Sequence, residues 1–309
     1  MEINLKSDIP IFPEFDPVHF SHKQSFEQIT SRFELYSDFN FNSFYSWNTD
    51  NKHLVSTLNG NLVLQLGDYI TGEPFYTFIG DSSIEKTVTS LISFAHARKF
   101  PAQLKLVPEF VIEELKNNKK FIVTEDQENH DYLFSIEELS ELSGNRYKSK
   151  RRAAQKCKTE NDIIIKKSLS AAEVAVQVIE FLNNWEDTKN ELGKEVDLGY
   201  ERVAIKRILE TLDSQSSLLL TGAFLNETLV GFSIDELLPQ GFVLSHYFKA
   251  TPAIYGLSEY LNQEVAQHLL SAGGKTWNWE QDLGIENLRT MKLSHRPIGR
   301  QKKITLSIK

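Results

Sequence analysis

The chain has 309 residues, of which 40% are hydrophobic and 25% are charged. This length suits two domains, and this composition predicts packed cores while excluding collagen-like and low-complexity chains. The single cysteine, Cys157, excludes an intramolecular disulfide and the zinc sites built from paired thiols. No apolar run approaches the roughly 18 residues of a membrane-spanning helix, so we expect a cytoplasmic protein.

Basic side chains are concentrated in two windows, although the net charge is −8. Residues 145–158 and residues 287–309 each contain seven Lys or Arg and no Asp or Glu, which leaves 20 basic against 42 acidic side chains elsewhere. An acidic body with two basic segments indicates local recognition of an anion. The alternative is that both segments are solvated faces that balance nearby acids.

The first half alternates helices and strands. Residues 25–39 have the aromatic spacing of a helix, and Asn59-Gly60 is a strong turn signal for a strand hairpin over residues 53–66. Apolar residues at helical spacing predict a helix over residues 85–98. The remaining expected elements are strands at 75–79, 104–107, 121–124 and 131–134 and a short helix at 110–115.

The second half repeats this order after a linker of helical pattern at residues 135–142. Amphipathic helices are expected at 171–185 and 202–212. The elements that follow are strands at 218–225, 228–238, 242–248 and 275–280 and helices at 257–270 and 285–291.

Both halves therefore run helix, hairpin, strand, helix, strand, helix, strand. Strands joined partly by hairpins and partly by helices predict a mixed sheet with helices on its faces. This order is similar to that of the GNAT acyltransferases. We expect an α/β (α+β) fold of two tandem GNAT-like domains, residues 1–134 and residues 135–309, with the active site in the second.

Three segments of the second half resemble a known family. They are residues 139–152 (LSELSGNRYKSKRR), residues 246–262 (beginning HYFKA and including Tyr255-Gly256), and residues 277–297 (beginning WNWEQDLG). Together they are similar to the C-terminal catalytic domain of phosphatidylglycerol lysyltransferase, over nearly the whole chain. Characterised relatives move an aminoacyl group from charged tRNA to the hydroxyl of phosphatidylglycerol, and Fem-type peptidyl transferases have a similar paired fold. The resemblance implies an aminoacyltransferase-like enzyme whose donor is aminoacyl-tRNA, with no other cofactor and no metal.

Five cations gather at the start of the helix that follows Gly144: Arg146, Lys148, Lys150, Arg151 and Arg152. Lys148, Arg152 and Lys156 are four residues apart and share a helix face. Guanidinium groups suit bidentate contact with phosphate. A tRNA acceptor end, a phospholipid head or a CoA diphosphate would each fit, and the alternative is a solvated helix start.

The strand at residues 242–249 carries two catalytic candidates, His246 and Lys249. His246 shares a face with apolar residues, and Lys249 lies on the opposite face. Fold analogy places the cleft where the central strands separate, close to this strand. The alternative for His246 is a hydrogen-bonded core residue. The loop that follows contains Tyr255-Gly256 as candidate phosphate contacts, but it lacks the usual glycine-rich diphosphate pattern, which disfavours acyl-CoA.

The strand expected after Lys275 would alternate an apolar face with a polar one that carries Glu280 and Asp282, two further catalytic candidates. Arg289 and Lys292, one helical turn apart, are candidate substrate contacts. The alternatives are ion pairing among these groups and a helix N-cap role for Asp282.

The leading hypothesis is transfer of an aminoacyl group from charged tRNA to a hydroxyl or amine acceptor, with phosphatidylglycerol or another lipid among the candidates. The alternatives are N- or O-acyl transfer from acyl-CoA and a catalytically silent module that binds RNA or anionic lipid. The expected partners are accordingly charged tRNA or acyl-CoA, with an anionic membrane surface as a further candidate. The amino acid, the acceptor and the oligomeric state stay open.

Overall fold

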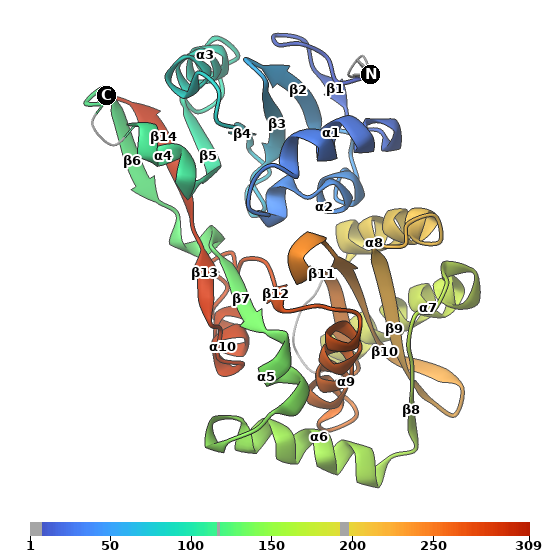
Figure 1. The fold of residues 1–309 in the computed structure, drawn as a ribbon. Helices are drawn as coiled ribbons and strands as arrows, with labels where there is room; N and C mark the ends of the chain where they lie inside the picture. The colour runs from blue at the N-terminus through green and yellow to red at the C-terminus, as the bar shows by residue number, and fades with distance from the viewer. Residues whose placement is uncertain (1–7, 116–117, 192–197) are drawn as a thin grey trace, which may run out of the picture. The chain divides into compact units, whose positions relative to one another are not determined.

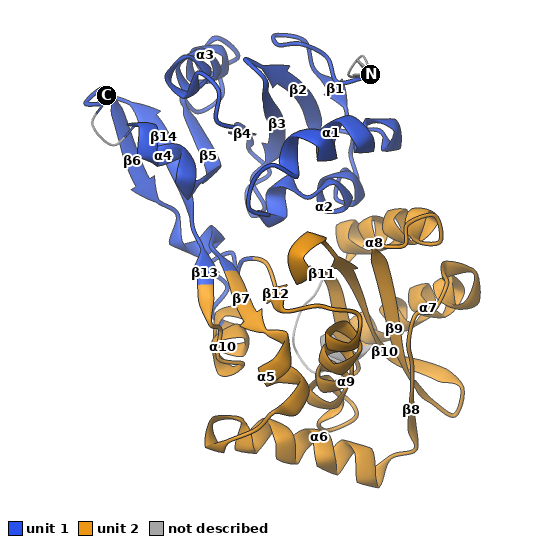
Figure 2. Ribbon diagram, in the orientation of Figure 1, with its two compact units in different colours: residues 1–131, 281–286, 300–309 blue, residues 132–280, 287–299 orange. Residues whose placement is uncertain are grey.

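The structure, a computed structural model, describes residues 8–115, 118–191 and 198–309 (Figure 1). The chain forms two compact units (Figure 2). Unit 1 comprises residues 1–131, 281–286 and 300–309, and unit 2 comprises residues 132–280 and 287–299. The boundary expected between residues 134 and 135 lies near the first crossing, but the chain then returns to unit 1 twice, which a single boundary does not describe.

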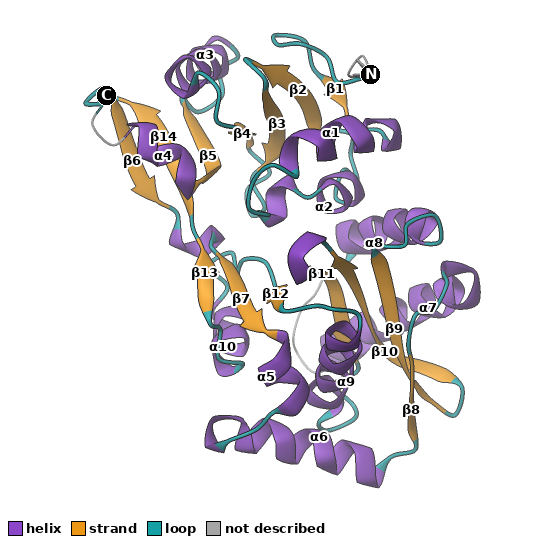
Figure 3. Cartoon of the chain, viewed as in Figure 1, coloured by secondary structure: helices purple, strands orange, loops and turns teal. Residues whose placement is uncertain are grey.

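Unit 1 is built on a seven-stranded sheet in the order β1-β2-β3-β4-β5-β14-β6. Its strands are β1 (Asp16–Pro17), β2 (Leu54–Leu58), β3 (Asn61–Gly67), β4 (Pro74–Ile79), β5 (Gln103–Pro108), β6 (Phe121–Glu125) and β14 (Lys303–Ile308). Its helices are α1 (Lys23–Thr30), α2 (Phe41–Ser46), α3 (Ile84–Ala97) and α4 (Ile112–Leu115), with 3-10 turns η1 (Phe20–His22), η2 (Ser37–Phe39), η3 (Glu109–Val111) and η4 (Gln127–Asn129) (Figure 3).

Alternation along β3 shows how this sheet is covered on both faces. Leu62, Leu64 and Leu66 pack in a core with the aromatic residues of α1 and α2. Val63, between them, packs on the opposite side with the apolar face of α3. Because successive strand residues point to opposite faces, the consecutive apolar residues Leu62, Val63 and Leu64 bury both faces of this strand.

The single helix expected over residues 25–39 is wrong. The chain instead forms α1, a connection with extended backbone at Tyr36, the turn η2, and then α2. Asn40 caps α2 by accepting a hydrogen bond from the Ser43 backbone N–H at 2.9 Å. The aromatic periodicity was real, but a second N-cap interrupts it.

Unit 2 has a second seven-stranded sheet, in the order β13-β7-β12-β11-β10-β9-β8. Its strands are β7 (Asp131–Ser135), β8 (Ile163–Lys166), β9 (Leu218–Leu225), β10 (Thr228–Leu237), β11 (Phe242–Ala250), β12 (Thr276–Asn278) and β13 (Gly299–Gln301). Its helices are α5 (Ile136–Glu141), α6 (Lys148–Glu160), α7 (Ala171–Glu191), α8 (Gly199–Leu212), α9 (Leu257–Ser271) and α10 (Glu286–Ser294), with turns η5 (Asn145–Tyr147) and η6 (Pro239–Gly241).

The two sheets follow one plan. In each, antiparallel strands lead to a parallel pair joined by a long helix: β4 and β5 through α3, and β11 and β12 through α9. In each sheet, the strand that follows the parallel pair in the sequence does not lie directly beside that pair. Another strand lies between them. β14 lies between β5 and β6, and β7 lies between β12 and β13. Each sheet therefore contains a strand that is remote in sequence from the two strands it lies between.

The expected linker at residues 135–142 is a core element instead. Ile136, Leu139 and Leu142 are buried and pack in the same cluster as the apolar residues of α9. The helical pattern was correct, and its apolar face is covered. The tandem α/β fold of two GNAT-like units is confirmed by two mixed sheets flanked by helices. None of the described helices combines the length and hydropathy needed to cross a bilayer.

Gly256 allows α6 to pack against the start of α9. A Cβ at Gly256 would lie 2.2 Å from the Ala153 carbonyl oxygen, whereas a Cβ at Gly144, whose φ is similar, would meet nothing within 4 Å. We expect Gly144→Ala to cost about 1–2 kcal/mol of stability through left-handed backbone strain. Gly256→Ala should cost at least about 2 kcal/mol more, because the new methyl group would clash with the backbone of Ala153, which cannot move without displacing α6. Urea unfolding of the two variants checks this, and equal losses would contradict it.

Candidate functional site

The sequence predicts a site in unit 2 where two central strands separate. The strands that separate are β11 and β12, because β11 pairs with β12 along only part of its length. Its parallel register with β12 joins Phe242 to Thr276, Val243 to Trp277 and Leu244 to Asn278, and extends no further. Since β11 continues to Ala250, its second half has left β12. This stretch carries both His246 and Lys249.

His246 lies in a polar cluster buried beneath this stretch. The register between β10 and β11 shifts at Ile234/Asp235, so that His246 lies in a bulge. Its Nε2 is 3.0 Å from Glu236 Oε2, and both side chains are almost fully buried. The structure thus places His246 as a buried, paired residue and adds a carboxylate that the sequence analysis missed.

Asp235 is the second carboxylate of this cluster. It accepts hydrogen bonds from Ser233 Oγ at 2.6 Å and from Trp277 Nε1 at 3.0 Å. Burial raises its pKa to about 6, against the lowering effect of those hydrogen bonds and of His246. The signal in the sequence that could have identified these carboxylates is the pair of adjacent acids, Asp235 and Glu236, in an otherwise largely apolar strand. A carboxyl that titrates near neutrality beside a histidine can exchange protons at physiological pH.

Lys249 lies at the end of the same strand. Its Nζ is 2.9 Å from Glu201 Oε2 and 4.7 Å from the centre of the Trp185 ring. The Trp185 indole N–H donates to the Ala250 carbonyl at 2.9 Å, which fixes the ring. Lys249 is therefore a positioned, paired cation, held by two residues that the sequence analysis did not select.

The cations of α6 divide into structural and exposed groups. Arg151 donates to the carbonyls of Leu142 and Gly144, Arg146 pairs with Glu138, and Lys150 Nζ is 3.9 Å from Glu259. Four further cations of α6 are exposed: Lys148, Arg152 and Lys156, which share one face, and Lys158, whose Nζ is 5.7 Å from the centre of the Tyr260 ring. Lys156 Nζ also lies 3.9 Å from Glu160 Oε2 at the exposed end of the helix. We call Lys148, Arg152 and Lys156 the basic face of α6.

Tyr255 lies beside this face, and Gly256 does not. The Tyr255 side chain is 67% exposed, and Lys156 Nζ is 5.4 Å from its ring centre. Gly256 packs closely against the backbone of Ala153 in α6. Tyr255 is thus accessible to a ligand, whereas the need for glycine at residue 256 is explained by this close packing.

The two basic windows of the sequence meet in unit 2. The Tyr147 hydroxyl donates to the His295 carbonyl at 3.3 Å. Burial and the neighbouring Glu138 together raise the pKa of Tyr147 to about 12, whereas Arg146 and Arg296 act in the opposite direction. Arg146 and Arg296, about 150 residues apart in the sequence, therefore flank one tyrosine.

The polar strand face expected after Lys275 is not formed, because β12 ends at Asn278 and Glu280 has a positive φ. Asp282 is fully buried and accepts from the Gly284 N–H at 2.9 Å, which orders the turn before α10. Lys292 is buried and donates to the carbonyls of Trp279 and Glu280 at 2.6 and 3.1 Å. Glu280 and Asp282 thus belong to a loop held by Lys292, and Arg289 is half-buried on α10.

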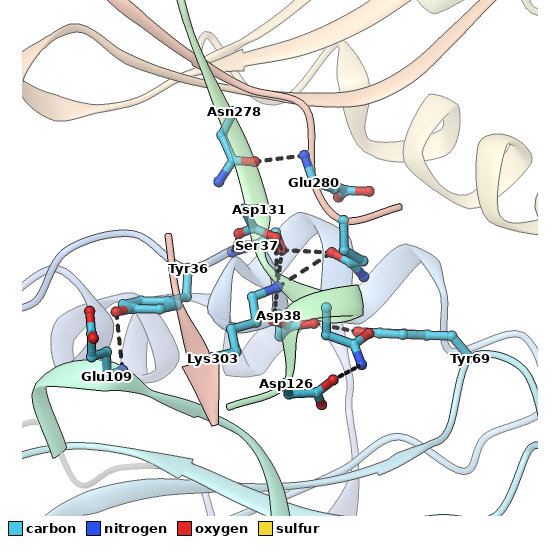
Figure 4. Close-up of polar contacts among 12 residues, drawn as sticks. Tyr36, Ser37, Asp38, Tyr69, Glu109, Asp126, Asp131, Asn278, Glu280 and Lys303 are labelled. Atoms are coloured by element: carbon cyan, nitrogen blue, oxygen red, sulfur yellow. Dashed lines mark hydrogen bonds and ion pairs between the residues drawn. The ribbon is translucent and has the colours of Figure 1, made fainter. Parts of the chain in front are cut away.

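A second buried polar cluster lies in unit 1 and centres on Lys303 (Figure 4). Lys303 Nζ is 2.6 Å from Asp131 Oδ1 and 2.5 Å from Asp38 Oδ2, and all three side chains are buried. Ser37 Oγ and Gln281 Oε1 lie 3.0 and 3.4 Å from the same nitrogen. Burial alone would lower the pKa of Lys303, but Asp131 and Asp38 raise it above its ordinary value.

This cluster borders a polar cleft of about 700 Å³ in unit 1. Tyr69 lines the cleft and donates from its hydroxyl to Asp38 Oδ1 at 2.5 Å. Acids predominate among the charged lining residues, and the lining cation Lys105 is paired with Asp68 at 2.7 Å. The charge of this cleft suits an ammonium group better than a phosphate.

Among the described residues, no group of three or more His, Cys, Asp or Glu side chains is placed to hold a metal ion. The Cys157 thiol is buried, and burial raises its pKa, which disfavours the reactive thiolate.

Comparison with known proteins places these features in a family. The family described as phosphatidylglycerol lysyltransferase, C-terminal, matches residues 31–306. The chain belongs to this family. Comparison with curated protein sequences gave no match.

Solved structures share its fold. A conserved protein of unknown function from Bacteroides thetaiotaomicron VPI-5482 is 21% identical, with a TM-score of 0.83 over 96% of this chain and 99% of that chain. L-PGS from Bacillus licheniformis is 10% identical, with a TM-score of 0.63 over 98% and 94% of the two chains. FemX is 10% identical, with a TM-score of 0.57 over 94% and 96%. The family and the fold indicate a transferase.

Replacing Lys303 tests the buried cluster of unit 1. We expect Lys303→Met to cost about 3–5 kcal/mol at neutral pH, because two buried carboxylates lose their counter-charge. The neighbouring Lys302 is half-exposed, so Lys302→Met should cost at most about 1 kcal/mol. Burial already raises the pKa of Asp38 above its ordinary value, and Lys303 opposes that rise. Without Lys303 the Asp38 carboxyl takes up a proton more readily, so the loss should shrink as pH falls. Urea unfolding at several pH values measures it, and a loss independent of pH would contradict the assignment.

Asp235 gives a second pH test. Because burial raises its pKa from an ordinary 3.8 to about 6 in the folded state, its contribution favours folding at low pH and declines as pH rises between these values. This rise in pKa corresponds to on the order of 3 kcal/mol. Asp235→Asn should therefore flatten the stability profile between pH 4 and 7. An unchanged slope in urea unfolding would show that Asp235 titrates normally.

Proposed function

We propose that the protein transfers an aminoacyl group from charged tRNA to a hydroxyl or amine acceptor, with lipid among the candidate acceptors. The observation that carries this proposal is the basic face of α6 beside the exposed ring of Tyr255. The second half of β11, which has left β12 and still pairs with β10, supplies the other candidate groups. Regularly spaced cations contact successive phosphates, and an exposed aromatic ring stacks on a base. Family membership supports the reaction class.

Within this proposal, each part of unit 2 has a distinct task. Lys148, Arg152 and Lys156 hold phosphates, and Lys249 neutralises charge that develops near the end of β11. The buried group of Asp235, Glu236 and His246 accepts the proton that the acceptor releases when its oxygen or nitrogen attacks the aminoacyl ester carbonyl. As the bond from that carbonyl to the tRNA ribose oxygen breaks, the same proton passes to the departing ribose oxygen. An activated ester requires mainly positioning and charge stabilisation, so this modest machinery suffices.

Acyl-CoA is the second candidate donor, and the loop before α9 argues against it. Diphosphate binding in GNAT acyltransferases depends on close approach to glycine-rich backbone at a helix N-terminus. Here the single glycine of that loop, Gly256, faces the carbonyl of Ala153. A ligand that prefers the folded state raises the melting temperature, so a shift with acyl-CoA would favour this second candidate.

The decisive assay incubates the protein with radiolabelled aminoacyl-tRNAs and an extract of total lipid and peptidoglycan precursors. We expect label from one amino acid in a tRNA-free product, and its loss in Lys249→Ala. Arg152→Glu with Lys156→Glu should weaken tRNA binding by about tenfold or more and reduce its salt dependence. Lys275→Glu, an exposed cation away from this face, is the matched control.

Two outcomes would overturn the proposal. Absence of transfer together with a thermal shift by acyl-CoA would move the assignment to an ordinary acyltransferase. Binding of tRNA without any turnover would indicate the silent binding module. Arg151→Ala is less informative than Arg152→Glu, because Arg151 also holds the carbonyls that precede α6.

A further inference from the structure

A serine, a histidine and a threonine form a hydrogen-bonded chain in unit 2. Ser168 Oγ lies 3.1 Å from His268 Nε2, and Thr221 Oγ1 lies 3.2 Å from His268 Nδ1. A nucleophile and a base within hydrogen-bond distance, with the base oriented by a third group, form the arrangement that activates serine hydroxyls. The group lies apart from the candidate transfer site, because His268 is in the last turn of α9 and Tyr255 precedes the first.

The backbone holds Ser168 beside the histidine ring. Ser168 follows β8 with a φ of 53°, a left-handed conformation that is uncommon for residues with a side chain. The Leu169 N–H donates to the Leu220 carbonyl at 3.0 Å, which ties this turn to β9 directly before Thr221. The Ser168 side chain is exposed. Strained backbone of this kind occurs where a turn must present one side chain to a reactant.

The surroundings keep His268 in the form that accepts a proton. Burial lowers its pKa, and the charge of Lys167 lowers that pKa in the same direction, so the ring is neutral near pH 7. Thr221 is only 1% exposed, which fixes its hydroxyl against the ring. When the Nδ1 proton is donated to Thr221, the lone pair of Nε2 faces the Ser168 hydroxyl.

We propose that Ser168 is a nucleophile toward small carboxylic esters, with His268 as its general base and Thr221 as the residue that positions that base. The Ser168 hydroxyl proton passes to His268 Nε2 as Oγ bonds to the ester carbonyl carbon. The bond from this carbon to the alcohol oxygen then breaks, and that oxygen takes the proton from Nε2. Water then attacks the acyl-serine with the same nitrogen as base, which releases the acid and restores the Ser168 hydroxyl.

Esters rather than amides are the expected substrates. Thr221 is neutral, so it cannot stabilise a histidinium ring as the carboxylate of a serine-protease triad does. An alcohol departs with less help from a proton donor than an amine does, so a weakly supported base suits an ester. Lys167 precedes Ser168 and supplies positive charge for the oxyanion, although its Nζ is also 3.2 Å from Glu264 Oε2.

A fluorophosphonate probe tests the nucleophile in the full chain, because it phosphonylates activated serines with loss of fluoride. We expect one adduct, located on Ser168 by peptide mass spectrometry, and an initial burst of nitrophenol from p-nitrophenyl acetate. Ser168→Ala should abolish both signals. His268→Gln should slow labelling by about a hundredfold, which is the lower range of what a general base contributes.

Ser271 provides a matched control, because its Oγ donates to the His268 backbone carbonyl at 2.7 Å and not to the ring. Ser271→Ala should label at the wild-type rate. Thr221→Val should slow labelling by about tenfold, and Thr221→Ser should keep it close to wild type. A packing role for Thr221 predicts the reverse order, since valine keeps the shape and serine keeps only the hydroxyl. Ser168→Ala should keep the wild-type melting temperature, because the side chain is exposed.

Three results would overturn the proposal. These are no adduct on the wild-type protein, an adduct confined to another residue, and a wild-type labelling rate in His268→Gln. The proposal does not rest on the proposed function. Lys249→Ala, which should lose aminoacyl transfer, should keep the Ser168 adduct, so the failure of either proposal is distinguishable from the failure of the other.

Discussion

The buried ion pair between Lys303 and Asp131 is the interaction on which the architecture depends. Lys303 is the first residue of β14, and Asp131 is the first residue of β7. Each of these two strands lies between two strands that are remote from it in sequence. Removing charges from water costs several kcal/mol per ion, so the pair is tolerated only in its full set of contacts. A chain that misplaces either strand leaves a buried charge unpaired.

This dependence explains why a single boundary does not divide the chain. Residues 1–134 could form most of the first sheet, but β14 lies between β5 and β6. Gln281 and Lys303 also come from the two later segments that return to unit 1, and both join Ser37, Asp38 and Asp131 in one polar cluster. Every segment of unit 1 thus contributes to the same buried site. Completion of that unit must await synthesis of the last residues.

Local signals in the sequence predicted local structure well. The Asn59-Gly60 turn, the apolar face of α3 and the helical pattern of α5 were each readable, because they depend on neighbours a few residues away. What failed depended on remote partners. The strand expected to reach Glu280 ends at Asn278, the bulge at His246 follows from register against β10, and Lys303 shows no local sign that it would be buried. Of the candidate residues, the exposed cations of α6 were placed by periodicity alone, while Glu236, Asp235 and Trp185 required the fold.

In unit 2 the cations of α6 are exposed, whereas the carboxylates and the histidine near β11 are buried. This arrangement favours a transfer reaction that requires little acid–base catalysis. The exposed cations lie on α6, where they can contact a polyanion and release its counterions. The carboxylates and the histidine lie beneath β11, where burial raises the pKa of Asp235 toward neutrality. A surface for phosphate and a shielded group for one proton are thus supplied by different elements of the same unit. Under the proposed function, the ester already carries the driving force, so the protein has chiefly to align acceptor and donor and to receive that proton.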